Sequence, residues 1–373
     1  MKKIVVVSIL ILSIFLVGCS DTKTSSGSNT ISIGFDADKG CTQDKYVALS
    51  GSIEVTAKNE GSDVGELEIL DGDRIKGEAE NIISGVAKKF TVKLDEGEYV
   101  IYCGRKQAKR ATLTVEKNSN ATDSKASEDI IKATAQYKDY VIAQTVLLET
   151  SVKALTDAVR AGEIEAAKQA FGPSREPWER IEPIAELFAK YDGVIDSRVD
   201  DFLSETDPEF TGFHRIEYSI FELNTTDGIS QIADKLDGDI LALTIEIKAL
   251  DIDPFDMAKG PQILMEEIAN GKITGEEDRY SGTDLFDFNA NIEGSKAIVD
   301  FLRPALLDVK SDLAKRYDEL NTKIVDRLNK YRNTDGTYQN YKMLTEQDKN
   351  QFKADVASAS ELLAELPGVL GLK

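Results

Sequence analysis

The chain contains a single histidine, His214, which stands three residues before Glu217 in the segment Gly-Phe-His-Arg-Ile-Glu. Side chains three residues apart on a helix project from the same face. An imidazole nitrogen and a carboxylate oxygen could therefore meet at one metal ion. The alternative is a structural histidine that is satisfied by hydrogen bonds. The metal hypothesis requires that other parts of the chain supply more ligands.

An acidic cluster at residues 175–182 offers such ligands and also holds the only tryptophan, Trp178. Pro177 suits the first turn of a helix, which predicts Glu176 just outside that helix and Glu179 in its first turn. Carboxylates at this position could bind a metal ion. They could equally serve only to offset the helix dipole.

Two further acidic clusters follow. In residues 192–201, Asp196 is the best-placed ligand. Residues 271–280 predict a loop that carries Glu276, Glu277 and Asp278 between a glycine-containing stretch and a tyrosine. Loops of this composition are often functional, but an exposed run of charges is the more common explanation.

The N-terminus has the features of an export signal. Two lysines precede an apolar run over residues 4–17, which ends in Leu16-Val17-Gly18-Cys19. This pattern predicts a lipoprotein signal peptide at residues 1–18, lipidation of Cys19 and a flexible tether over residues 19–30. The protein is therefore expected on the extracytoplasmic face of the cell membrane. The net charge of −21 argues against nucleic-acid binding, because no basic patch would meet the phosphates.

Residues 31–117 alternate between apolar and polar side chains in short segments that are separated by turn-forming residues. This period predicts a small β-sandwich or barrel. Besides Cys19, the chain has two cysteines, Cys41 and Cys103, and both fall in this region. An even pair in an exported protein favours a disulfide, with a thiolate metal site as the alternative.

A polar linker is expected at residues 118–127, and residues 128–373 change to a helical period that predicts an all-α bundle. The expected helices cover residues 130–161, 181–190, 213–223, 229–250, 257–270, 292–302, 305–331 and 346–366. The predicted fold class is therefore multidomain, a β-sandwich followed by an all-α domain.

Several motifs resemble the EfeO/EfeM family of imelysin-like proteins from the Efe iron-uptake system. They are Glu176-Pro-Trp-Glu-Arg-Ile-Glu-Pro183, Ile195-Asp-Ser-Arg198, Phe210-Thr-Gly-Phe-His-Arg-Ile-Glu217 and Gly271-Lys-Ile-Thr-Gly-Glu-Glu-Asp-Arg-Tyr-Ser281. The β region resembles the cupredoxin-like domain of the longer members through Glu66-Leu-Glu-Ile-Leu-Asp-Gly72 and Tyr102-Cys103. The resemblance implies an iron-binding protein that works with an Efe-type permease and a haem peroxidase.

The resemblance also implies a set of ligands. They are His214 and Glu217, with oxygens from Glu176, Glu179 and Asp196. Relatives often carry a histidine where this chain has Gly282, which cannot be a ligand here. In the β region, Cys41, Cys103 and Glu66 correspond to residues suspected of holding a second metal ion, unless the cysteines form a disulfide. A blue-copper centre is not expected, because this region has no histidine.

One imidazole among several carboxylates suits ferric or ferrous iron better than a soft metal. We therefore expect an iron-binding protein that captures iron for the permease and is not an enzyme. One alternative is an imelysin-type metallopeptidase, although a zinc peptidase with an H-E-x-x-H helix needs two histidines. The other is a surface module that binds no metal.

Overall fold

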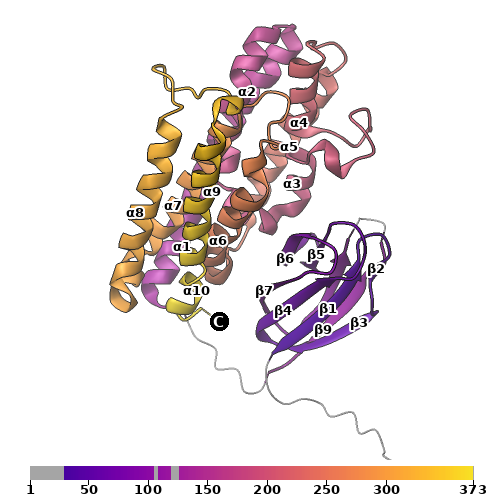
Figure 1. Cartoon of the computed structure of the whole chain (residues 1–373), viewed down its shortest axis with the longest axis vertical. Helices are drawn as coiled ribbons and strands as arrows, with labels where there is room; N and C mark the ends of the chain where they lie inside the picture. The colour runs from indigo at the N-terminus through magenta and orange to yellow at the C-terminus, as the bar shows by residue number, and fades with distance from the viewer. Residues whose placement is uncertain (1–28, 105–107, 119–125, 373) are drawn as a thin grey trace, which may run out of the picture.

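The computed structural model describes residues 29–104, 108–118 and 126–372. The expected signal peptide, Cys19, most of the tether and most of the linker lie outside these residues. The described chain forms a β-sandwich followed by a helical domain, and this arrangement confirms the predicted fold class (Figure 1).

The β domain consists of two packed sheets. One sheet has the strand order β2-β1-β4-β7, and the other has the order β3-β9-β8-β5-β6. The strands are β1 (Thr30–Asp36), β2 (Gly40–Cys41), β3 (Lys45–Leu49), β4 (Gly51–Asn59), β5 (Gly65–Asp71), β6 (Arg74–Ile82), β7 (Ala87–Leu94), β8 (Gly97–Cys103) and β9 (Ala111–Glu116). The alternation in the sequence has a direct structural result, because every second side chain of a strand faces the core. Ile53 and Val55 of β4 and Leu67 and Ile69 of β5 are fully buried between the sheets.

The helical domain begins with a long, well-capped helix, α1 (Glu128–Ala161). Its first turn is capped by Ser127, whose hydroxyl accepts from the Ile130 N–H, and Gly162 ends it in the left-handed conformation. The other helices are α2 (Ile164–Glu179), α3 (Ala189–Ile195), α4 (Gly212–Glu217), α5 (Ser230–Ala249), α6 (Pro254–Asn270), α7 (Asp284–Val309), α8 (Ser311–Asn329), α9 (Glu346–Leu363) and α10 (Leu366–Val369). Short helical turns are η1 (Glu182–Phe188), η2 (Val199–Asp201), η3 (Tyr218–Glu222), η4 (Lys272–Thr274) and η5 (Tyr341–Met343).

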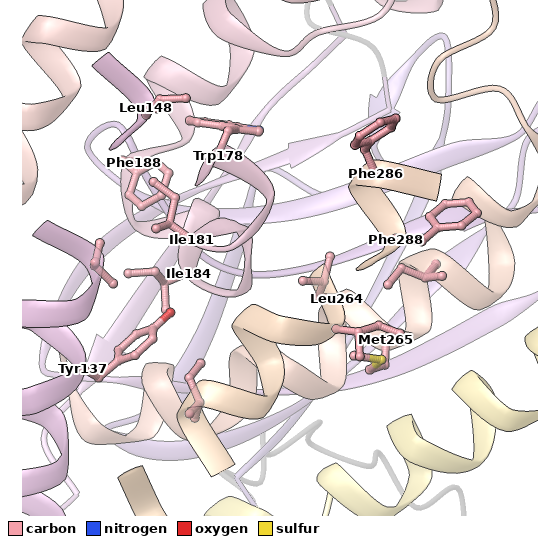
Figure 2. Packing of buried hydrophobic residues seen from close by; sticks show 14 of the residues in the cluster. Tyr137, Leu148, Trp178, Ile181, Ile184, Phe188, Leu264, Met265, Phe286 and Phe288 are labelled. Carbon is pink, nitrogen blue, oxygen red and sulfur yellow. The ribbon is translucent and has the colours of Figure 1, made fainter. Parts of the chain in front are cut away.

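One core runs through the bundle, in which α1 packs against α2, α5 and α7, and α6 packs against α9. Aromatic and aliphatic side chains such as Trp178, Phe188, Leu264 and Phe288 fill it (Figure 2). The Trp178 ring meets the Phe188 ring edge-on, with 5.9 Å between centroids. In the part of the chain that the structure describes, no helix combines the length and apolarity needed to cross a membrane.

Two predictions about the helices were wrong: a helix start at Pro177, and a break between the helices expected at 292–302 and 305–331. Pro177 does not begin a helix but lies near the end of α2, which also contains Pro173, so Glu179 is in the last turn rather than the first. Pro304 likewise lies inside α7, and the break between α7 and α8 falls at Lys310. A proline inside a helix costs about 3 kcal/mol. Tertiary packing outweighs that cost here, because both helices bury large side chains, including Phe171, Trp178 and Leu302.

The two domains meet where β6 packs against η1 and α3. Lys76 Nζ lies 3.1 Å from Asp256 Oδ2, and Lys93 Nζ lies 3.5 Å from Asp253 Oδ2. A cleft of about 560 Å³ opens beside this contact, with Phe90 of the β domain and Phe255 of α6 in its lining. The hydrophobic cores of the two domains are separate.

Candidate metal centre

Helix α4 carries the H-x-x-E pair and buries it inside the helical domain. The helix starts at Gly212, whose φ of 76° lies in the left-handed region. A Cβ atom at this position would lie 2.2 Å from the Ile195 carbonyl oxygen, so only glycine allows α4 to begin this close to the end of α3. This close approach brings His214 beside Asp196, with 3.5 Å between His214 Nε2 and Asp196 Oδ1.

His214 and Glu217 face each other as the spacing predicts. Nδ1 of His214 lies 3.1 Å from Oε2 of Glu217, and the two residues are only 2% and 0% exposed. The other oxygen, Oε1, accepts hydrogen bonds from the backbone N–H groups of Tyr280 (3.0 Å) and Ser281 (2.8 Å). Glu217 therefore holds the acidic loop at residues 271–283 against α4.

That loop brings buried acids to the site. Glu277 and Asp278 are 4% and 0% exposed, so the expectation of an exposed charge run was wrong for these two residues. Asp278 Oδ1 lies 3.9 Å from His214 Nδ1. Lys272, also in the loop, is buried with its Nζ 2.5 Å from Glu182 and 3.3 Å from Glu277.

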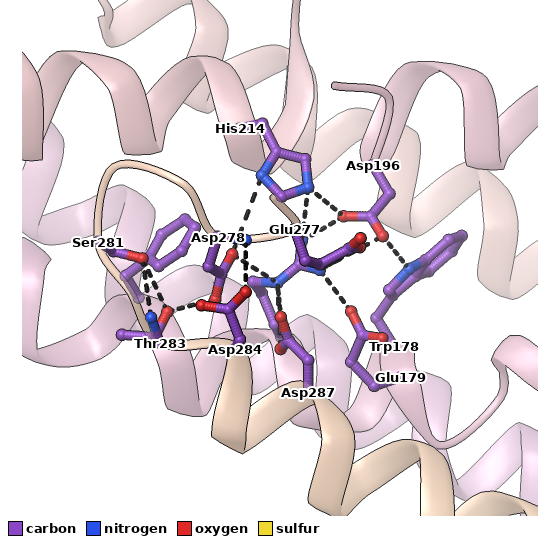
Figure 3. Close-up of polar contacts among 12 residues, drawn as sticks. Trp178, Glu179, Asp196, His214, Glu277, Asp278, Ser281, Thr283, Asp284 and Asp287 are labelled. Carbon is purple, nitrogen blue, oxygen red and sulfur yellow. Dashed lines mark hydrogen bonds and ion pairs between the residues drawn. The ribbon is translucent and has the colours of Figure 1, made fainter. Parts of the chain in front are cut away.

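Glu179, Asp196, Glu277, Asp278 and Asp287 gather on one side of His214 (Figure 3), and a buried arginine forms ion pairs with all five. Arg175 of α2 has no exposed surface and donates to Glu179 at 2.5 Å, to Asp287 of α7 at 3.1 Å and to Asp196. Its guanidinium lies 5.2 Å from the centre of the Phe213 ring. A buried charge is tolerated only when it is paired, and here each of these charges has a partner.

Among the residues that the structure describes, two groups of side chains have the spacing to hold a metal ion. One is Asp196, His214 and Glu277, and the other is His214, Glu217 and Asp278; in each, the ligand atoms lie within 4.8 Å of one another. Two buried oxygens nearby, Asp278 Oδ1 and Asp284 Oδ2, accept no hydrogen bond. Unsatisfied buried acceptors are costly, and a cation would satisfy them. The donor set of the second group therefore fits a hard metal ion.

The environment shifts the pKa values of the prospective ligands. Burial raises the pKa of Asp278 to about 6, although the Arg175 charge opposes the shift. Burial and Arg175 lower the pKa of His214, but the Glu217 and Asp196 carboxylates outweigh them and the net shift is upward. For Asp196, burial raises the pKa, but the Arg175 and His214 charges outweigh it and the net shift is downward.

Comparison with known proteins shows the family. The family model for imelysin, which is labelled a peptidase family (M75), matches residues 133–367, and the cupredoxin-like domain model matches residues 9–115. The protein named "Iron uptake system component EfeO" from Escherichia coli K12 is 43% identical over 338 residues, which are 90% of each chain. The protein of the same name from Shigella flexneri matches to the same extent. The chain belongs to the EfeO/EfeM family.

The structure of this EfeO/EfeM family member brings together four of the five ligands expected from the sequence. His214 contacts both Glu217 and Asp196, and Glu179 joins them through Arg175. Glu176 is not part of the cluster. Its carboxylate lies 2.7 Å from the Arg180 guanidinium and is partly exposed, because successive residues of α2 point in different directions.

Several residues of the cluster were not expected as ligands or partners. They are Arg175, Lys272, Glu277, Asp278, Asp284 and Asp287. The loop that holds Glu277 and Asp278 was noted for its acidity, but its burial depends on contacts with α4. Asp284 and Asp287 open α7, where acids are common in any helix. No local pattern distinguishes them from solvated residues.

In the β domain, Cys41 and Cys103 form a disulfide. The disulfide was one of the two alternatives, and it leaves no thiolate for a metal site with Glu66. Within residues 29–104, 108–118 and 126–372, groups of three side chains with ligand spacing occur only in the helical domain.

Gly282 turns the acidic loop just before α7. Its φ is 69°, and a Cβ atom there would lie 2.4 Å from the Asn340 side chain. Its carbonyl accepts from the Tyr341 N–H at 2.8 Å. A histidine at this position would therefore require Asn340 to move.

Proposed function

We propose that this protein is an extracytoplasmic iron-binding lipoprotein that captures iron in the helical domain and passes it to an Efe-type permease. Lipidation at Cys19 would hold it at the membrane, and a haem peroxidase would be its second partner. The names of its relatives support a role in iron uptake. The lipid anchor and the two partners rest on the sequence pattern and on family membership.

The observation that carries the proposal is the group of His214, Glu217 and Asp278, in which one buried carboxylate oxygen lacks a hydrogen bond. One nitrogen and several oxygens form a hard donor set, which suits ferrous or ferric iron. We assign these three residues as the principal ligands. Asp196 and Glu277 form the adjacent group around the other imidazole nitrogen, and Glu179 holds Arg175 in place.

We propose a binding protein rather than an enzyme, although the label of the imelysin family model favours a peptidase as the second candidate. The chain has one histidine, whereas the H-E-x-x-H zinc peptidases use two on one helix. The ligands here are also buried. A fluorogenic peptide assay compares the metal-loaded protein with His214→Ala. Metal-dependent cleavage that is lost in the variant would replace our proposal with the peptidase.

An iron titration tests the binding site. The purified protein is titrated with ferrous iron under anaerobic conditions and with chelated ferric iron in air. We expect near-stoichiometric binding by the wild type and a loss of at least about tenfold in affinity for His214→Ala, Glu217→Gln and Asp278→Asn, because each removes one ligand.

The matched control for this titration is Glu176→Gln, which removes a carboxylate from the same helix as Arg175 but outside the cluster. It should bind iron like the wild type. If the three ligand variants also bind like the wild type, the assigned site is wrong. If the wild type binds no iron, the proposed function fails.

A further inference from the structure

Arg175 lies within the acidic cluster, beside the two groups of prospective ligands. Its guanidinium lies within ion-pair distance of the carboxylates of five residues: Glu179, Asp196, Glu277, Asp278 and Asp287. The side chain has no exposed surface, and an arginine keeps its charge at any pH that a protein encounters. The metal-free site thus carries a permanent internal positive charge.

The guanidinium also touches both groups of prospective ligands. Its Nη1 lies 3.5 Å from His214 Nε2 and donates to Asp196. Its Nε lies 3.6 Å from Asp278 Oδ1, the oxygen that lacks a hydrogen bond, and its Nη2 lies 3.6 Å from Glu277 Oε1. The same carboxylates would therefore face the arginine and the bound ion.

We propose that Arg175 is a built-in counter-cation, which stabilises the metal-free site and weakens metal binding so that the ion can be released. The inference rests on the proposed function, since it requires that an ion binds beside His214. Arg175 is not a ligand of the ion. Its positive charge sets the affinity of the site for the metal.

Removal of the guanidinium has two effects of opposite sign, one on stability and one on metal affinity. Without metal, removal of the guanidinium leaves buried carboxylates to repel one another, which destabilises the fold. With metal bound, the same removal leaves the carboxylates to interact with the ion alone. It also ends the repulsion between the guanidinium and the metal ion. For a residue that only maintained the shape of the site, the two effects would have the same sign. Its loss would lower both the stability and the metal affinity.

The test compares Arg175→Gln and Arg175→Lys with the wild type. Affinity is measured by calorimetry with Mn²⁺ and, under anaerobic conditions, with Fe²⁺; stability is measured as the thermal midpoint without metal. We expect Arg175→Gln to melt at a lower temperature but to bind both ions about tenfold more tightly or better, with slower metal release. Arg175→Lys keeps the charge but loses the planar fork of donors, so it should bind the ions no more tightly than the wild type.

Arg180→Gln is the matched control. Arg180 follows α2 and pairs with Glu176 and Glu293, outside the cluster, so this variant should keep the wild-type affinity. If Arg175→Gln folds only when metal is present, that dependence supports the proposal. If it does not fold at all, Arg175→Lys decides, and tenfold tighter binding by that variant, which keeps the charge, overturns the proposal.

The two hypotheses fail separately. A wild-type protein that binds neither ion defeats the proposed function. A wild-type protein that binds metal, with Arg175→Gln binding equally or more weakly, defeats only the role of Arg175.

Discussion

At the scale of single residues, His214 is surrounded by charge on both sides of its ring. Nδ1 faces Glu217, and Nε2 lies between Asp196 and Arg175. Among the described residues, no backbone carbonyl forms a hydrogen bond with either ring nitrogen. The ring therefore depends on carboxylates for its orientation, which is how metal-bound histidines are commonly held.

The protonation of these residues predicts how metal affinity depends on pH. Asp278 has a pKa of about 6, and the pKa of His214 is raised above its ordinary value. Both groups must lose a proton to bind metal, so protons compete with the ion in the range where each group titrates. Affinity should therefore be highest above about pH 7 and fall as the pH drops through about 6.

This dependence is checked by measuring the Mn²⁺ dissociation constant between about pH 5 and pH 8. If Asp278 had an ordinary carboxylate pKa, only His214 would compete with the ion for protons in this range, and the affinity would fall less steeply. Asp278→Asn serves as the comparison, because the weaker binding that remains should depend less steeply on pH. An affinity that is equal at about pH 5 and pH 7.5 would contradict the assignment of both ligands.

At the scale of elements, the site depends on how closely α3, α4 and the acidic loop approach each other. Gly212 allows α4 to start against the Ile195 carbonyl, and Glu217 fixes the loop through two backbone N–H groups. The carbonyl of Ile273 in the loop also accepts from the Tyr341 hydroxyl. Three segments that are distant in sequence are thus joined around the imidazole.

Gly212→Ala tests this arrangement. The substitution forces a side chain into a left-handed conformation and against the Ile195 carbonyl oxygen. We expect a loss of about 1–3 kcal/mol in the free energy of unfolding. Iron affinity should fall with it, because α4 carries both His214 and Glu217. Chemical denaturation and the iron titration measure the two effects.

The control for this prediction is Gly193→Ala in α3. A Cβ atom there would meet only Ser197 Oγ, at 4.0 Å, and the residue is in a helix. It should be neutral or stabilising by up to about 1 kcal/mol. If Gly212→Ala behaves like this control, the close approach of α4 to α3 does not govern the site.

At the scale of the whole molecule, all residues of the candidate metal centre come from the helical domain. The two domains have separate hydrophobic cores, and their contact includes exposed and half-buried ion pairs such as Lys76–Asp256. Domains that are connected in this way generally fold independently. The β domain is therefore not required to build the centre.

We expect a fragment that spans residues 126–373 to fold and to bind iron within about threefold of the full chain. Circular dichroism and the iron titration would check both statements. A loss of more than about tenfold in a folded fragment would show that the β domain contributes to the site. Lys76→Ala in the full chain serves as the control, because it weakens the domain contact without removing the β domain. It separates a contribution of the β domain to iron affinity from damage caused by truncation.

The periodicity and spacing of residues along the chain were sufficient to predict some features of the structure. The alternating segments predicted the β-sandwich, the helical period predicted the bundle, and the spacing of His214 and Glu217 predicted their contact, because each depends on neighbours along the chain. The expected helix start at Pro177 and the expected break between residues 302 and 305 were wrong, since burial of residues such as Trp178 outweighs the local cost of a proline inside a helix.

The sequence by itself determined that the chain carries one imidazole, three residues from a carboxylate, among many acids. Only the tertiary structure decided which acids belong to the centre. It placed Glu176 outside, buried Asp278 without a hydrogen bond on Oδ1, and set Arg175 among five carboxylates. The physical reason is that burial and pairing of a charge depend on contacts between α2, α4, α7 and the acidic loop, and these segments are far apart in sequence.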